Sequence, residues 1–173
     1  TVLGVDVGKA ANMLNKLHCA MIELYNGDPK RIQHFCKVHS YAKLIAELEK
    51  TDKETLFIIE TAALTHDIGI HYCEEKYGSC SGKLQEKEGP AIAKKLLEEL
   101  GFDKNVIERV VYLIAHHHTY DNIDGTDYQI LVEADFLVNI YEDGLSRDAA
   151  EHTYKKVFKT KAGRRICREM FGL

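Results

Sequence analysis

Apolar residues recur along almost the whole chain at intervals of three and four residues, the spacing of one face of an α-helix. Three of these sets are Phe35-Val38-Ala42-Ile45, Ile107-Val110-Val111-Ile114 and Ile130-Ala134-Leu137-Tyr141. The chain contains only two prolines, and no clear alternation of apolar and polar residues indicates paired strands. The pattern therefore predicts an all-α fold.

Start and stop signals divide this pattern into separate helices. Asn26-Gly27 ends a first helix that we expect over about residues 9–25, and Asp28-Pro29 opens the second as an N-cap followed by proline. Thr51 is expected to cap the third helix. The chain then holds roughly seven or eight helices in one domain over residues 1–173, with C-terminal helices over residues 146–173 packing on the rest.

One small, polar stretch interrupts the helical pattern in the middle of the chain. It runs from Tyr77 to Gln85, and we expect an ordered loop there that is long enough to line a site. The next helix is expected to begin near Glu88.

Composition excludes several classes of function. The formal net charge is −4, so the chain has no excess of positive charge to bind a nucleic acid backbone, and we expect no nucleic acid polymer as partner. No apolar run is long enough to cross a bilayer, and no signal peptide or targeting motif is recognised from Thr1 onward. The five cysteines are odd in number and form no C-x-x-C pair, which favours free thiols in a reducing cytoplasm over a disulfide framework. We therefore expect a cytoplasmic protein.

The doublet His66-Asp67 places two metal-ligand residue types directly after a strongly apolar stretch. Ile59, Ala63 and His66 share one helical face, so the histidine lies on the core stripe. Both side chains can face one ion only where the helix ends, and Gly69 supplies that break. A metal-ligand pair is favoured here over a core histidine hydrogen-bonded to a carboxylate.

Asp135 and His34 are two further polar residues on apolar helices. Asp135 shares a face with Leu131 and Val138, where an ionised carboxylate needs either a metal or a basic partner from another helix. His34 lies beside the apolar stripe of the second helix, where a histidine taken alone would most often be structural or face solvent. Together His34, His66, Asp67 and Asp135 form a mixed nitrogen and oxygen set, which suits one divalent ion such as Mn, Fe, Co, Ni, Zn or Mg.

The run His116-His117-His118 ends another apolar helix. Successive residues point about 100° apart on a helix, so one or two of the three can face a common site. The others are expected to cap the helix end or to be exposed.

The order His…His-Asp…Asp resembles that of the HD-domain superfamily of metal-dependent phosphohydrolases, whose fold is an all-α bundle. The resemblance covers about residues 31–141, with His34 as the first histidine, His66-Asp67 as the doublet and Asp135 as the last aspartate. It implies a single-domain HD-type helical bundle and one divalent metal ion held by those four residues.

Relatives with two metals carry additional histidines between the doublet and the last aspartate. One of these matches His116 or His117, and the other falls at about Gln85, where this chain has no histidine. This departure argues against assuming a second ion. Many relatives also carry lysine or glutamate two or three residues after the doublet, where this chain has Gly69 and Ile70.

The resemblance implies metal-assisted hydrolysis of a phosphate ester or anhydride in a small, nucleotide-like molecule. Asp67 would bind the ion with one oxygen and orient water with the other, or bridge a second ion, and His116 or His117 would act as general acid. Arg31 and Lys83 are candidate phosphate contacts. The alternatives are a non-catalytic HD module that binds a nucleotide or metal as a sensor or interaction domain, and a structural helical domain.

Overall fold

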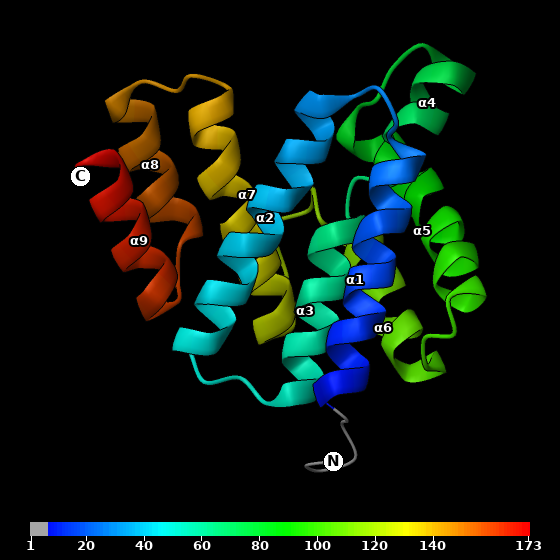
Figure 1. Ribbon diagram of the computed structural model, residues 1–173. Helices are drawn as coiled ribbons and strands as arrows, with labels where there is room; N and C mark the ends of the chain where they lie inside the picture. The colour runs from blue at the N-terminus through cyan, green and yellow to red at the C-terminus, as the bar shows by residue number, and fades with distance from the viewer. Residues whose placement is uncertain (1–6) are drawn as a thin grey trace.

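The computed structural model describes residues 7–173, and within this range the chain forms only helices (Figure 1). The all-α prediction is confirmed, and none of the helices in this range is long and apolar enough to span a membrane. The helices are α1 Val7–Leu24, α2 Pro29–Leu48, α3 Lys53–Thr65, α4 Ile70–Tyr77, α5 Gly82–Glu99, α6 Lys104–His116, α7 Thr126–Glu142, α8 Arg147–Val157 and α9 Lys161–Phe171.

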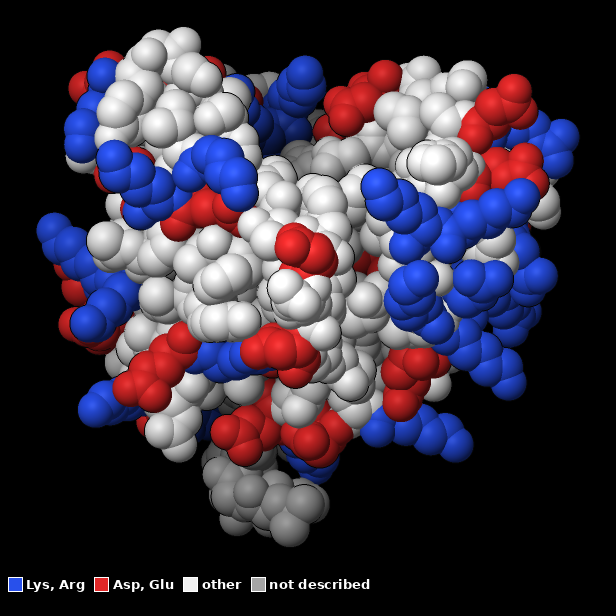
Figure 2. All heavy atoms as spheres, turned by 180° about the vertical axis from the view of Figure 1, so that it is seen from behind, with Lys and Arg blue, Asp and Glu red and all other residues white. Residues whose placement is uncertain are grey.

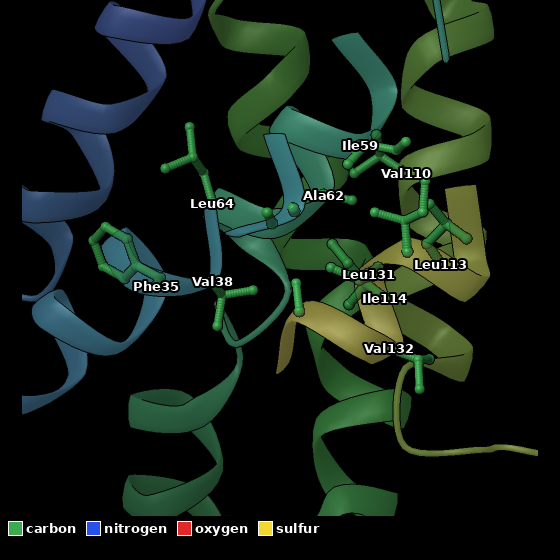
Figure 3. Close-up of a cluster of buried hydrophobic side chains, with 14 of the residues drawn as sticks. Phe35, Val38, Ile59, Ala62, Leu64, Val110, Leu113, Ile114, Leu131 and Val132 are labelled. Carbon is green, nitrogen blue, oxygen red and sulfur yellow. The ribbon is translucent and has the colours of Figure 1, made fainter. Parts of the chain in front are cut away.

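Helix α3 lies at the centre of the domain. It contacts α1, α2, α6 and α7, and every one of its residues from Ile58 to Thr65 is buried. Figure 3 shows how Ile59 and Ala62 of α3 face Val110 of α6 within one cluster of apolar side chains. The doublet that follows α3 is therefore delivered into the interior of the protein.

The start of α2 agrees with its capping signals. Asp28 accepts a hydrogen bond from the Arg31 backbone N–H at 3.3 Å, and Pro29 occupies the first helical position. The predicted cap at Thr51 is wrong by one residue. Asp52 takes that place instead, because its side chain accepts a 2.7 Å hydrogen bond from the Thr55 N–H at the start of α3.

The largest difference from the sequence prediction lies between α4 and α5. The loop predicted from Tyr77 to Gln85 is wrong over its second half, because α5 begins at Gly82 rather than near Glu88. Ser81 caps this helix, and Pro90 lies inside it. The early start places Gln85 on the buried face of a helix instead of in a loop.

The turn after α3 packs closely on α5 through two glycines. A Cβ atom on Gly69 would lie 3.1 Å from the Cα atom of Gly89. The approach leaves little space for a side chain at either position, so both glycines hold the turn against α5.

The two C-terminal helices pack on the rest of the bundle: α9 contacts α2 and α7, and α8 contacts α7. The fully buried carboxylate of Glu133 on α7 binds the segment between α8 and α9. This carboxylate accepts hydrogen bonds from the backbone N–H groups of Lys159 and Thr160 at 2.9 and 3.0 Å, and from the Thr160 hydroxyl at 2.6 Å. It thereby binds the segment that directly precedes α9.

Candidate metal centre

The doublet lies where the α3 helix ends. His66 is the C-terminal cap of α3 and is 1% exposed, and Asp67 follows in the turn before α4. Because the chain leaves the helix here, two adjacent side chains face the same space. The hydroxyl of Tyr25, the residue directly after α1, donates to the backbone carbonyl of Asp67 and holds the turn in place.

The four residues predicted as one ligand set come together from α2, α3 and its following turn, and α7. His34 Nε2 lies 3.2 Å from Asp67 Oδ2 and 3.2 Å from Asp135 Oδ1. His66 Nε2 lies 3.2 Å from Asp67 Oδ2 and 3.4 Å from Asp135 Oδ1. Two nitrogens and two oxygens therefore face one point between the helices.

The second ring nitrogen of each histidine contacts an acceptor, which decides what the first can do. His34 Nδ1 lies 2.9 Å from Glu142 Oε1, and His66 Nδ1 donates to the Ala63 carbonyl at 2.7 Å. His117 Nδ1 donates to the Ile114 carbonyl at 2.6 Å. When the ring is neutral and its proton is held on Nδ1, each Nε2 presents a lone pair toward the centre, as a metal ligand requires.

The residues fit a divalent cation. The Nε2 atoms of His66 and His117 and the Oδ1 atom of Asp135 are buried without a hydrogen-bond partner among residues 7–173. Such atoms are costly to bury unless something else binds them. Two ligands about 2.1 Å from a shared ion lie about 3.0 Å apart in octahedral and about 3.4 Å apart in tetrahedral geometry, close to the separations observed.

The centre is built to hold positive charge. Burial disfavours the imidazolium form of His34, but hydrogen bonds and charges from Asp135 and Asp67 outweigh burial and raise the pKa of His34 to about 11. The same balance of burial against Asp67 and Asp135 raises the pKa of His66 to about 10. Burial is likewise outweighed for Asp67, whose contacts with the surrounding histidines hold its pKa well below the usual range.

Asp67 also belongs to a second group of ligand atoms. Its Oδ1 atom lies 3.5 Å from His117 Nε2, and one ligand atom each of Asp67, His117 and His118 lie within 4.8 Å of one another. Asp67 thus stands between the two groups, with a different oxygen facing each.

Helix α5 positions His118. Gln85 donates from its amide to the Cys80 carbonyl at 2.7 Å, so its Oε1 atom faces His118 Nε2 at 3.4 Å. A Cβ atom on Gly82 would lie 2.8 Å from the His118 ring, so that glycine leaves room for it. Burial, followed by the charge of His117, lowers the pKa of His118 to about 4, which keeps the ring neutral.

The structure separates the two histidines between which the sequence left the register open. His117 is 2% exposed and faces Asp67. His116 turns away, donates to the Tyr112 carbonyl at 2.8 Å and stacks on the Tyr112 ring. The geometry brings His117 to the centre and leaves His116 outside these contacts.

The two candidate phosphate contacts make ion pairs of their own. Arg31 pairs with Glu74 at 2.5 Å and with Asp28 at 3.4 Å. The Lys83 side chain is 85% exposed, and its amino group lies 3.6 Å from Glu86. Neither residue forms a hydrogen bond or ion pair with the ligand atoms described above.

Three residues of this centre were not predicted as part of it. Glu142 follows Asp135 by seven residues, two turns along the same face of α7, and this spacing was a usable signal. His118 was hidden by the uncertain register of a triple histidine run. Gln85 was considered only as a missing histidine, although its amide contacts His118.

Comparisons with known proteins agree with this geometry. The family described as HD domain matches residues 31–159. A solved structure described as a predicted HD superfamily hydrolase from an uncultured Thermotogales bacterium is similar over 97% of this chain and 92% of that one, with 25% sequence identity and a TM-score of 0.68. No curated protein sequence matches the chain.

Proposed function

The chain belongs to the HD domain family, and from that premise we propose that it is a metal-dependent phosphohydrolase acting on a small, nucleotide-like phosphate compound. The observation that carries the proposal is the presence of three buried potential metal-ligand atoms, from His66, His117 and Asp135, that have no hydrogen-bond partner among residues 7–173. The mixed histidine and carboxylate set suits Mn, Fe, Co, Ni, Zn or Mg.

His34, His66, Asp67 and Asp135 would hold the first divalent cation. Asp67, His117 and His118 would hold a second, with Asp67 shared between the two positions. A cation bound there would lower the pKa of water and neutralise charge on a phosphate oxygen.

The remaining steps fall to the protein. Asp67 Oδ1 is the oxygen that does not face His34 and His66, so it would orient the attacking water when only the first position is filled and would bind the second cation when both are filled. The Nδ1 contacts of His34, His66 and His117 with acceptors behind them would keep the three rings oriented while charge develops on the phosphate. Burial of His66, His117 and Asp135 limits the access of bulk water to the centre.

The proposal is tested with protein purified without a histidine tag. Bound metal is measured by elemental analysis, and phosphate release from nucleotides is measured with each divalent ion. His66→Ala and Asp67→Ala should abolish hydrolysis and reduce bound metal, while His116→Ala, changed outside the centre, should retain both. Unchanged hydrolysis in the first two variants would overturn the proposal.

A second candidate function is a non-catalytic HD module that binds a nucleotide or metal as a sensor. It is favoured by Gln85, which stands where two-metal relatives carry a histidine, and by Gly69 and Ile70 after the doublet. Saturable nucleotide binding without turnover under any metal would support this function over hydrolysis.

A further inference from the structure

A recess of about 550 Å³ lies between α7, α8 and the segment that joins α6 to α7. Its lining includes the aromatic rings of Tyr120 and Phe136 and the side chains of His152, Lys156 and Lys159. The volume lies within the range of about 300–1,000 Å³ that is typical of small-molecule sites. The recess is therefore large enough for a nucleoside.

Two aromatic residues that line the recess are close in sequence to candidate metal ligands. Phe136 directly follows Asp135 on α7, and Tyr120 comes two residues after His118. The two rings contact each other edge to face, with centroids 5.0 Å apart. On each of these two segments, an aromatic residue of the recess thus lies within two residues of a candidate metal ligand.

The aromatic wall suits a planar base. Tyr120 is 44% exposed although its ring packs on Phe136. An exposed aromatic face that is fixed by a neighbouring ring is a stacking platform for a nucleobase.

The recess is also lined by basic side chains. Lys156, Lys159 and His152 are exposed side chains of the recess, and Asp121 is the one acidic residue among the described residues that line it. Within residues 7–173 neither lysine amino group forms an ion pair, whereas the neighbouring Lys155 lies 3.5 Å from Glu151. Two unpaired amino groups in one recess favour an anion.

The charge of the surrounding region points the same way. Residues 146–173 contain eight lysines and arginines and three acidic residues, a formal charge of +5 in a chain of −4. Figure 2 shows lysine and arginine side chains gathered on the right of that view, the side on which α8 and α9 lie. This field would attract a substrate that carries more negative charge than the scissile phosphate alone.

We infer that the recess binds the distal part of a nucleotide that carries a second phosphate group, with its base on Tyr120 and that phosphate at Lys156 and Lys159. The inference rests on the proposed function for the position of the scissile phosphate. It adds a substrate class: nucleotides with two separate phosphate groups are preferred over nucleoside monophosphates.

Three probes separate the parts of the site: adenosine 3′,5′-bisphosphate, adenosine 5′-monophosphate and 4-nitrophenyl phosphate. The double variant Lys156→Gln/Lys159→Gln should lower the ratio of kcat/KM for the bisphosphate to that for 4-nitrophenyl phosphate by about tenfold or more. Tyr120→Leu should lower the ratios for both nucleotides. The matched control Lys155→Gln should keep all ratios at the wild-type values.

The outcomes distinguish this inference from the proposed function. Equal loss on all three probes, or unchanged ratios in the double variant, overturns the inference while hydrolysis itself stands. If the wild-type protein hydrolyses none of the probes, the proposed function fails. In that case calorimetric titration of the metal-loaded protein tests the inference. Relative to its affinity for inorganic phosphate, the double variant should bind the bisphosphate about tenfold or more weakly than the wild type does, and an unchanged relative affinity would overturn the inference.

Discussion

Glu142 Oε1 lies 2.9 Å from the Nδ1 atom of His34, and this contact determines which ring nitrogen of His34 faces the metal centre. The two residues are 108 positions apart in the sequence and join α2 to the end of α7. A carboxylate behind a ligand histidine both fixes the ring and makes it a stronger donor.

Glu142→Ala should weaken divalent cation binding by about tenfold to a hundredfold, because the His34 ring loses its orienting acceptor. Glu142→Gln should retain most of the affinity, since an amide oxygen can accept the same N–H. Asp143→Ala, one residue further along and exposed, is the matched control. Calorimetric titration with Mn²⁺ measures all three, and equal affinity in Glu142→Ala and the wild type would contradict the assigned role.

The number of cations is predicted to depend on His117 and His118. His117→Ala should lower the bound metal from about two ions to about one per chain, because it removes a ligand that faces only Asp67 Oδ1. His66→Ala should remove the first position instead. Elemental analysis after dialysis gives the count, with His116→Ala as the adjacent control; a count of one in the wild type would rule out the second position.

The metal-free protein is predicted to lose stability as pH rises. The pKa of His34 is about 11 in the folded protein and 6.5 as the reference value, so its contribution is fully present below pH 6.5 and is lost as pH rises toward 11. Between pH 6.5 and 9 we expect the Tm in chelator to fall by about 5 °C or more.

Two comparisons isolate that effect. His34→Asn should reduce the dependence of Tm on pH, because it removes one of the two histidines of the centre whose pKa is raised in the folded protein. Saturating divalent cation should also flatten it, because the bound ion requires the neutral ring. A wild-type slope that persists in His34→Asn would assign the effect to other groups.

Much of the centre was predictable because its main residues are exceptions to a regular pattern. His66 and Asp135 lie on apolar helical stripes, where a polar side chain needs a partner. Registers at helix ends were not predictable, since an error of one residue turns a side chain by about 100°. That uncertainty left His116 and His117 as alternatives and hid His118. The start of α5 was not predicted because Gly82 and its polar neighbours are typical of a loop. In the structure Ser81 caps the helix that begins at Gly82.

Glu133 is predicted to stabilise the fold without affecting the metal. Its buried carboxylate accepts four hydrogen bonds, including one from Gln129 at 2.6 Å. Glu133→Ala should lower the free energy of unfolding by about 2–4 kcal/mol, because it leaves buried donors unpaired. Urea unfolding measures the loss, and elemental analysis should show unchanged metal content.

Gly163 offers an independent test of the same contact. A Cβ atom at this position would lie 1.8 Å from Glu133 Oε1, so Gly163→Ala should destabilise the protein despite the higher helix propensity of alanine. Gly82→Ala, in contrast, should act on the His118 ring and lower metal content. If Gly82→Ala also changes stability and leaves the metal content unchanged, Gly82 has no role in placing His118.

The hydrogen bond from Tyr25 to the Asp67 carbonyl bears on where the smallest working unit of this protein begins. The region that matches the family starts at residue 31, but Tyr25 belongs to the segment before it and is 1% exposed. A shortened chain cut to the matched region would lose the clamp behind the doublet together with part of the core that α1 covers. The unit to express and study is therefore longer at its N-terminal side than sequence matching alone would define.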